Sequence, residues 1–215
     1  MTLRRFAKGL WLTSCIVSVA IGVEVGAVAY SQSPMLDAPV KEGKLAPVEA
    51  RLPSAPRVVR LSESERQIGT YGGDLRILMG RSKDVRMMVV YGYARLVIYN
   101  EKFDIVPDIL ERVDVVEDRI YTLHLRPGHR WSDGKPFTSE AFRFWWEDVA
   151  NDKGISPVGP PKKLLVDGQP PKFEVIDETT VRYTWSKPNP FFLPALAGTR
   201  PIYIYAPKHF LKKYH

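Results

Sequence analysis

The stretch that decides the fold is LRPGHRWSDGKPFTSEAFRFWWEDV, residues 125–149. Pro127-Gly128 suits the two central positions of a type II turn, because proline presets φ and glycine accepts a positive φ. Asp133-Gly134 marks a second turn a few residues later. The segment is therefore expected to turn twice before its apolar residues adopt a helical spacing.

A helix is expected to begin directly after the second turn. Thr138 can cap it, and Glu140 lies in the positively polarised first turn. Phe137 and Phe142 occupy the two positions of a hydrophobic staple. An apolar stripe at helical spacing follows, formed by Phe142, Trp145, Trp146 and Val149. This spacing predicts that most of the aromatic cluster packs against a core.

The composition is that of a globular chain with a moderate positive charge. Of the 215 residues 45% are hydrophobic, which is enough for the core of one or two domains. The net charge of +7 comes from 31 basic and 24 acidic residues, interspersed without a block of five like charges. Nucleic-acid binding requires a clustered basic stripe or a recognised motif, and the sequence has neither. We therefore expect no nucleic-acid partner.

Residues 1–29 have the pattern of a secretory signal peptide. Basic residues precede an apolar run over residues 10–23, and residues 27–29, Ala-Val-Ala, match a cleavage site. Glu24 limits the run to 14 residues, short of the roughly 20 that span a bilayer, so cleavage is favoured over an uncleaved anchor. Cys15, the only cysteine, lies inside the apolar run, which argues against lipidation. We expect export to the periplasm.

The rest of the chain divides into two parts. Residues 30–60 are rich in proline and poor in large apolar side chains, which predicts an extended linker or wrapping arm. Residues 61–215 are expected to form the globular part. An amphipathic helix with Phe210, Leu211 and Tyr214 on its apolar face begins near the end and has no C-cap. We therefore expect an N-terminal fragment of a longer protein.

Alternating apolar residues predict several strands in the globular part. Single strands are expected at residues 74–79 and 202–205. Hairpins are expected over residues 113–125, turning at 117–119, and over residues 173–185, turning at 177–178. Between the hairpins, residues 151–171 are rich in proline and glycine and form a long loop, which is uncommon in a compact domain unless it serves binding.

No pattern of catalytic or metal-ligating residues emerges. His124 alternates with apolar strand residues and His129 follows the Pro-Gly turn, so we expect two exposed histidines that do not converge on a metal ion. His209 and His215 are six residues apart and face different sides of a helix. The sequence has no G-x-S-x-G elbow, H-E-x-x-H motif or P-loop. We expect no enzyme activity, no cofactor and no metal.

Six short segments follow one another in an order that points to a known family. They are YGGDL at 71–75, VPDIL at 106–110, YTLHLRPG at 121–128, WSDGKPFT at 131–138, VRYTW at 181–185 and APKHFL at 206–211. Together they closely resemble the signature of family 5 extracellular solute-binding proteins. That family serves ABC importers of peptides, nickel complexes and related solutes.

The resemblance implies a mixed α/β fold, the partial first lobe of a two-lobed periplasmic-binding-protein-like structure. Such proteins close two lobes about a hinge and bury the solute between them. Val113 replaces a tryptophan of the family and Ala141 replaces an acidic residue, which puts one packing contact and one cap in doubt. Trp131 and Trp146 are expected to pack in the core.

Two loops resemble the segments that approach the solute cleft in this family. One follows the strand expected at residues 74–79, and the other follows the tryptophan-rich helix. The candidate ligand-binding residues in and near these loops are Arg81, Ser82, Asp84, Tyr91, Tyr93, Pro157 and Val158.

The expected function is that of the extracytoplasmic solute-binding component of an ABC importer for peptides or related solutes. The expected partners are the solute and the membrane permease subunits of the transporter, with the binding protein itself a monomer. A truncated, free-standing lobe that contacts other proteins or has lost binding is the alternative. An exported hydrolase is a more distant one.

Overall fold

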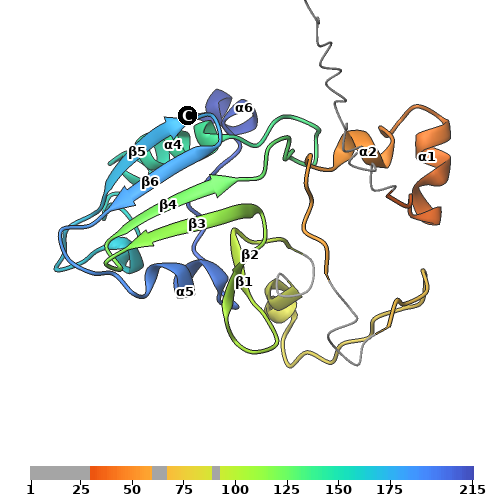
Figure 1. Cartoon of the computed structure of the whole chain (residues 1–215), viewed down its shortest axis with the longest axis horizontal. Coiled ribbons are helices and arrows are strands. Elements are labelled where there is room, and N and C mark those ends of the chain that lie inside the picture. The colour runs from red at the N-terminus through yellow and green to blue at the C-terminus, as the bar shows by residue number, and fades with distance from the viewer. Residues whose placement is uncertain (1–29, 60–66, 89–92) are drawn as a thin grey trace, which may run out of the picture. The chain divides into compact units, whose positions relative to one another are not determined.

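A computed structural model of the chain describes residues 30–59, 67–88 and 93–215. Four strands form one antiparallel sheet in the order β3-β4-β6-β5 (Figure 1). They are β3 (Leu110–Val116), β4 (Ile120–Leu125), β5 (Lys172–Asp177) and β6 (Thr180–Thr184). A two-stranded antiparallel sheet pairs β1 (Val97–Tyr99) with β2 (Ile105–Pro107). The mixed α/β class predicted from the sequence is confirmed.

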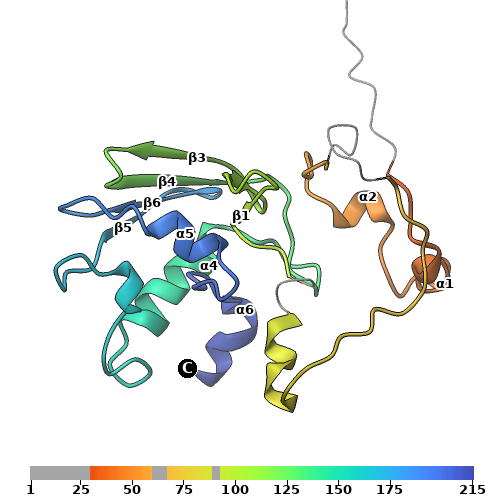
Figure 2. The same cartoon turned by 90° about the horizontal axis from the view of Figure 1, so that it is seen from below.

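The helical segments are short. They are η1 (Pro34–Leu36), α1 (Asp37–Lys41), α2 (Val48–Arg51), η3 (Ser82–Met88), α4 (Ser139–Phe144), η4 (Trp145–Ala150), η5 (Lys162–Leu164), α5 (Phe192–Ala197), α6 (Lys208–Leu211) and η6 (Lys212–Tyr214). The η4 segment is a π-helix and the other η segments are 3₁₀-helices. In Figure 2, α4, α5 and α6 lie on the same side of the four-stranded sheet.

Both predicted hairpins are present. In the turn between β3 and β4, Glu117 and Asp118 have positive φ values of 53° and 47°. Arg119 N donates to Val116 O at 3.0 Å across this turn. Two positive φ values match the right-handed twist of the paired strands, as in a type I′ turn. The β5–β6 turn is held differently, by the Asp177 carboxylate accepting from Thr179 N at 2.8 Å.

Strand alternation sends one set of side chains into the core. The core-facing residues of the two central strands and the position after β6 are no more than 2% exposed: Tyr121, Leu123, Leu125, Val181, Tyr183 and Trp185. On the opposite face, His124 Nε2 lies 2.8 Å from Asp114 Oδ2, and Arg182 Nε donates to Thr122 Oγ1 at 3.1 Å. One face of the sheet is therefore aromatic and aliphatic, and the other is polar.

Aromatic side chains join the sheet to the loops around it. Phe192 of α5 lies 4.9 Å from the Trp185 ring and 5.1 Å from the Tyr121 ring, measured between centroids. Trp185 Nε1 donates to Leu164 O at 2.7 Å, and Tyr121 OH donates to Asn189 O at 3.0 Å. Because buried N–H and O–H groups are costly when unpaired, these two bonds fix where the loops cross the core.

The predicted helix start is confirmed in detail. Thr138 Oγ1 accepts from Glu140 N at 3.3 Å, and the staple rings of Phe137 and Phe142 lie 5.7 Å apart. After Phe144, however, the helix continues as the π-helix η4 instead of the α-helix that the spacing predicts. Phe144, the last residue of α4, is buried, whereas Trp146 in the π-helix is half-buried and packs against the core.

Two predicted strands are absent from the described residues. Residues 74–79 run outside any sheet, with Leu75 72% and Leu78 102% exposed. Residues 202–205 also lie outside a sheet, although Ile204 is fully buried and Ile202 N donates to Ala195 O at 3.0 Å. Alternation indicates a two-sided segment, but a strand also requires a neighbour that completes its hydrogen bonds. The β1–β2 pair was not predicted.

The proline-rich segment contains short helices as well as extended chain. Its residues 52–57 contact the Pro127 turn: Ser54 N donates to Pro127 O at 3.0 Å, and Arg126 Nη1 donates to Ala55 O at 2.9 Å. Arg57 Nη1 lies 3.3 Å from Asp108 Oδ1. Among the residues that the structure describes, no helix is long and apolar enough to span a bilayer.

Candidate functional site

The predicted ligand-binding residues lie in separate exposed segments. Arg81 and Ser82 are exposed at the start of η3, where Asp84 N donates to Arg81 O at 2.9 Å. Tyr93 is 67% exposed, and Tyr91 lies outside the described residues. Arg81, Ser82 and Tyr93 are therefore accessible, as ligand-binding residues of a loop must be, whereas Asp84 is half-buried.

The other two candidates lie in the loop after η4. Pro157 is exposed, and Val158 is 94% exposed in a turn between Ser156 and Gly159, where Gly159 N donates to Ser156 O at 2.9 Å. Within the described part of the chain, no hydrogen bond or ion pair links this loop to η3. That the two loops line one solute site stays a prediction.

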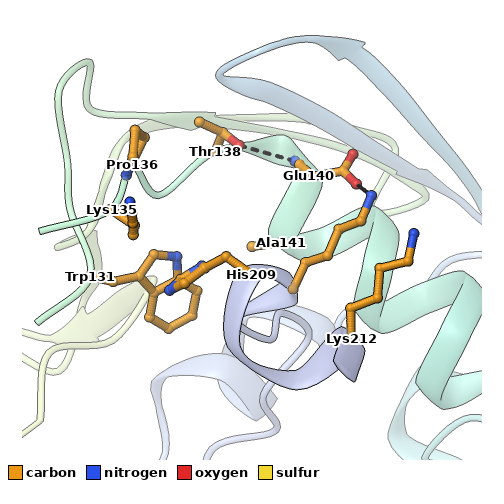
Figure 3. Close-up of a pocket in the computed structure, with 9 residues that line it drawn as sticks. Trp131, Lys135, Pro136, Thr138, Glu140, Ala141, His209 and Lys212 are labelled. Atoms are coloured by element: carbon orange, nitrogen blue, oxygen red, sulfur yellow. Dashed lines mark hydrogen bonds and ion pairs between the residues drawn. The ribbon is translucent and has the colours of Figure 1, made fainter. Parts of the chain in front are cut away.

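A hollow of about 410 Å³ lies between the Trp131 loop, the first turn of α4 and α6 (Figure 3). Trp131 forms one wall, held by the edge of Phe137 at 5.0 Å between ring centroids. His209 packs beside this wall, with its ring 6.2 Å from the Trp131 ring between centroids. Trp131 is only half-buried, so it both packs on the core, as predicted, and borders this hollow.

Ion pairs engage the acidic groups beside this hollow. Glu140 accepts from Arg143 Nε at 2.8 Å and is also bonded by Lys208. Partial burial opposes ionisation of Glu140, but the hydrogen bonds from Arg143 and Lys208 prevail and keep its pKa below the ordinary value. Glu140 is therefore a carboxylate at neutral pH with its charge already compensated.

Asp133 is engaged in a similar way. Its Oδ1 accepts from Lys135 N at 3.0 Å, and its Oδ2 lies 2.7 Å from His209 Nε2. The backbone N–H of Lys135 and the His209 ring hold the pKa of Asp133 below its usual value. The sequence did not predict this pair, because the two residues are separated by 76 positions and neither belongs to a motif containing the other.

A second hollow, of about 470 Å³, lies beside α5. Lys162, Lys163 and the 74% exposed Phe191 contribute to its lining. Asn189 Nδ2 donates to Lys163 O at 3.4 Å and so joins the two segments that border it. None of the described candidate ligand-binding residues lines either of these two hollows.

The histidines have structural partners. The prediction that His124 and His129 are exposed is wrong, since both are half-buried. His124 Nε2 lies 2.8 Å from Asp114 Oδ2. Burial lowers the pKa of His129, whose ring lies 5.7 Å from the Phe137 ring between centroids. Over residues 30–59, 67–88 and 93–215, no group of three or more His, Cys, Asp or Glu residues is placed to hold a metal ion.

The chain belongs to family 5 of the bacterial extracellular solute-binding proteins. The model of that family's middle region matches residues 104–214, which include β2 to β6, the helix after Thr138 and α6. The match confirms the resemblance inferred from the short sequence segments.

Individual proteins to which the chain is similar are periplasmic binding proteins. It is 30% identical over 198 residues to the periplasmic alpha-galactoside-binding protein of Rhizobium meliloti, covering 82% of this chain and 28% of that protein. It superposes on the oligopeptide-binding protein OppA with a TM-score of 0.71 and 34% identity, covering 87% of this chain and 28% of OppA. It also superposes on MelB of Agrobacterium fabrum C58, in complex with stachyose, with a TM-score of 0.68 and 25% identity, covering 87% and 31%.

The chain thus spans somewhat under a third of the length of these relatives. Its fold corresponds to part of a periplasmic binding protein, in agreement with the predicted partial lobe. The proteins that it resembles are named as binding proteins and not as enzymes.

Proposed function

We propose that this chain is part of the solute-binding component of an ABC importer and contributes one wall of its solute site. The observation that carries the proposal is the superposition on oligopeptide-binding OppA over 87% of the chain. Proteins of this type bury a solute between two lobes, and one partial lobe supplies only some of the surrounding surface. In this proposal the 215 residues correspond to the first part of a longer, two-lobed protein.

In this proposal the exposed loops reach the solute and the sheet supports them. The residues proposed to line the site are the seven candidates named from the sequence: Arg81, Ser82, Asp84, Tyr91, Tyr93, Pro157 and Val158. Trp185 anchors the second of these loops through its bond to Leu164 O. A rigid sheet carrying accessible loops is a common arrangement for binding sites.

Peptides are the first solute class that we propose, because of the likeness to OppA. Oligosaccharides containing α-galactosides are the second. That alternative is favoured by 30% identity over 82% of the chain to an alpha-galactoside-binding protein and by the likeness to MelB, whose structure holds stachyose. The two classes differ in charge, so a binding panel separates them.

The cellular setting follows from the same proposal. We propose export to the periplasm, removal of residues 1–29 as a signal peptide, action as a monomer and docking to the permease subunits of the transporter. The apolar run that ends at Glu24 and the Ala-Val-Ala sequence at residues 27–29 support export.

A hydrolase receives little support from the hollow beside Trp131. His209 and Asp133 form a pair there, but the one hydroxyl among the lining side chains belongs to Thr138, which accepts from Glu140 N as a helix cap. A nucleophile of the serine-hydrolase type must donate its proton to the histidine, and among the described residues no hydrogen bond joins Thr138 to His209. We therefore propose no catalytic role for these residues.

The test is titration calorimetry with two proteins, the 215-residue chain and the product of the reading frame continued past codon 215 if that frame remains open. The panel contains di- to pentapeptides, raffinose and stachyose. Because affinity changes tenfold for each 1.4 kcal/mol, loss of one wall should leave the short chain at about millimolar or weaker. The longer protein should reach about micromolar for one class.

Two outcomes contradict the proposal. Micromolar binding by the 215-residue chain alone would mean that the site is complete within these residues. Absence of binding to every member of the panel by a longer, folded protein would remove both proposed solute classes. A stop codon directly after codon 215 would favour the alternative of a free-standing lobe that contacts other proteins.

A further inference from the structure

We propose that the hollow beside Trp131 binds a small organic anion with an apolar body, at a site separate from the loops assigned above to solute binding. Three segments form it: the Trp131 loop, the first turn of α4 and the start of α6. Its volume of about 410 Å³ lies within the usual range for small-molecule sites. The ligand class follows from the charges and the aromatic wall.

The charges around the hollow are unbalanced in favour of cations. Lys135, Lys208 and Lys212 line it, and Glu140 is the one acidic residue among the lining side chains. Lys208 already bonds Glu140. Within the described part of the chain, neither the Lys135 nor the Lys212 ammonium has an ion pair or side-chain hydrogen bond. Two of the three lysines that line this space, both exposed, are therefore without an ionic partner among the described residues.

The acidic groups at the border already have other partners. Glu140 is held by Arg143 at 2.5 and 2.8 Å as well as by Lys208. Asp133 is held by His209 at 2.7 Å and by the backbone N–H of Lys135. An anionic ligand would meet donors that the protein leaves unused, so its charge need not displace an existing ion pair.

The apolar part of the ligand is indicated by Trp131. Phe137 and Tyr205 hold its ring at centroid distances of 5.0 and 6.1 Å, so the indole is fixed before a ligand arrives. Figure 3 shows Trp131 and His209 at one end of the hollow and Glu140 at the other. A ring placed against an indole gains contact area at little entropic cost to the protein.

The test uses three probes with the same ring and different charges: phenyl phosphate, benzyl alcohol and benzylamine. Binding to the 215-residue chain is followed by ¹H–¹⁵N NMR, including the indole N–H signals. Small ligands of about ten heavy atoms at an efficiency near 0.3 kcal/mol per atom bind in the millimolar range. We expect phenyl phosphate to bind at least fivefold more tightly than either other probe. Its affinity should also fall as sodium chloride is raised from 20 to 300 mM, since the lysines are exposed.

Substitutions then locate the site. Lys212→Gln and Lys135→Gln should each weaken phenyl phosphate binding by about two- to fivefold, the range for one exposed charge pair. Lys213→Gln is the matched control, because Lys213 lies on the same segment but over the rings of Phe210 and Tyr214, at 5.0 and 4.9 Å. Circular dichroism checks that all three variants are folded.

Each of three results would overturn the proposal. The first is absence of phenyl phosphate binding at 20 mM. The second is equal affinity for phenyl phosphate and benzyl alcohol, which would mean that charge is not recognised. The third is an equal effect of Lys213→Gln and Lys212→Gln, which would reduce the binding to general surface charge. None of these results bears on the solute site of the proposed importer component, whose candidate residues lie elsewhere.

Discussion

Phe142→Ala should destabilise the fold strongly, because Phe142 connects the start of α4 to the core. Its side chain is fully buried, and its ring lies 5.7 Å from Phe137 and 5.6 Å from Tyr205 between centroids. Removing a buried phenylalanine ring costs about 1.5–3 kcal/mol in transfer free energy, and the cavity and lost ring contacts add to this cost. We expect a decrease of about 3–5 kcal/mol in the free energy of unfolding.

Phe210→Ala is the matched control for this experiment. Phe210 is 53% exposed on α6, and its nearest aromatic contact is Tyr214 at 6.0 Å. The same change of side chain should therefore cost less than about 1 kcal/mol. For a chain of this length each kcal/mol lowers Tm by about 2–4 °C, so Phe142→Ala should lower it by about 6–20 °C.

Urea unfolding followed by tryptophan fluorescence and by far-UV circular dichroism measures both variants. If Phe142→Ala and Phe210→Ala unfold at the same urea concentration, the apolar stripe that begins at Phe142 is not part of the core and the packing argument fails. Should the alanine variant lack a cooperative transition, Phe142→Leu supplies the comparison. It keeps most of the volume and should cost about 1–2 kcal/mol.

Four further results are expected. Thr138→Ala should cost about 1 kcal/mol in urea unfolding and Thr138→Ser almost nothing, because the cap oxygen is kept. Replacing Glu117 by Asn and Asp118 by Gly should stabilise the chain by about 0.5–1 kcal/mol, because these residues accept the positive φ of both positions; a lower urea midpoint would contradict the turn assignment. The pKa of Glu140 lies below 4.5 in the folded chain, so its carboxylate adds stability above that pH and loses it as the pH falls through the folded pKa. The difference in unfolding free energy between wild type and Glu140→Gln, under about 1 kcal/mol at this partly exposed site, should therefore shrink from about pH 6 to pH 3. The mass of protein recovered from the periplasm should match a chain beginning at or near Tyr30, and recovery of full-length protein in the cytoplasm would contradict export.

Features stabilised by neighbours in the sequence were predictable. The cap at Thr138 needs only the N–H of Glu140, two residues later, and the staple needs only the ring five residues beyond Phe137. The β3–β4 turn depends on four consecutive residues. Strand alternation places Tyr121 and Leu123 on the same face of β4, and this face is buried. In each case the stabilising interaction falls within one turn or one strand period, so the local pattern contains it.

Features that depend on residues distant in the sequence were not predictable from it. Residues 74–79 have the alternation of a strand, but no described segment pairs with them, and Leu75 is consequently exposed. Residues 202–205 place Ile204 in the core without joining the sheet. The π-helix after Phe144 has the same apolar spacing at its start as an α-helix, so the sequence pattern alone does not separate the two.

The hollow beside Trp131 follows the same rule and explains why the family motif alone does not define its chemistry. The motif at residues 131–138 supplies the indole wall, the turn through Asp133 and the cap at Thr138, all of which are local structure. The other side of the hollow comes from α6, which starts 70 residues after the motif and contributes His209, and from η6, which contributes Lys212. The segment at residues 131–138 therefore supplies the scaffold of the hollow and one of its lysines, Lys135, whereas Lys208 and Lys212 come from a distant part of the chain.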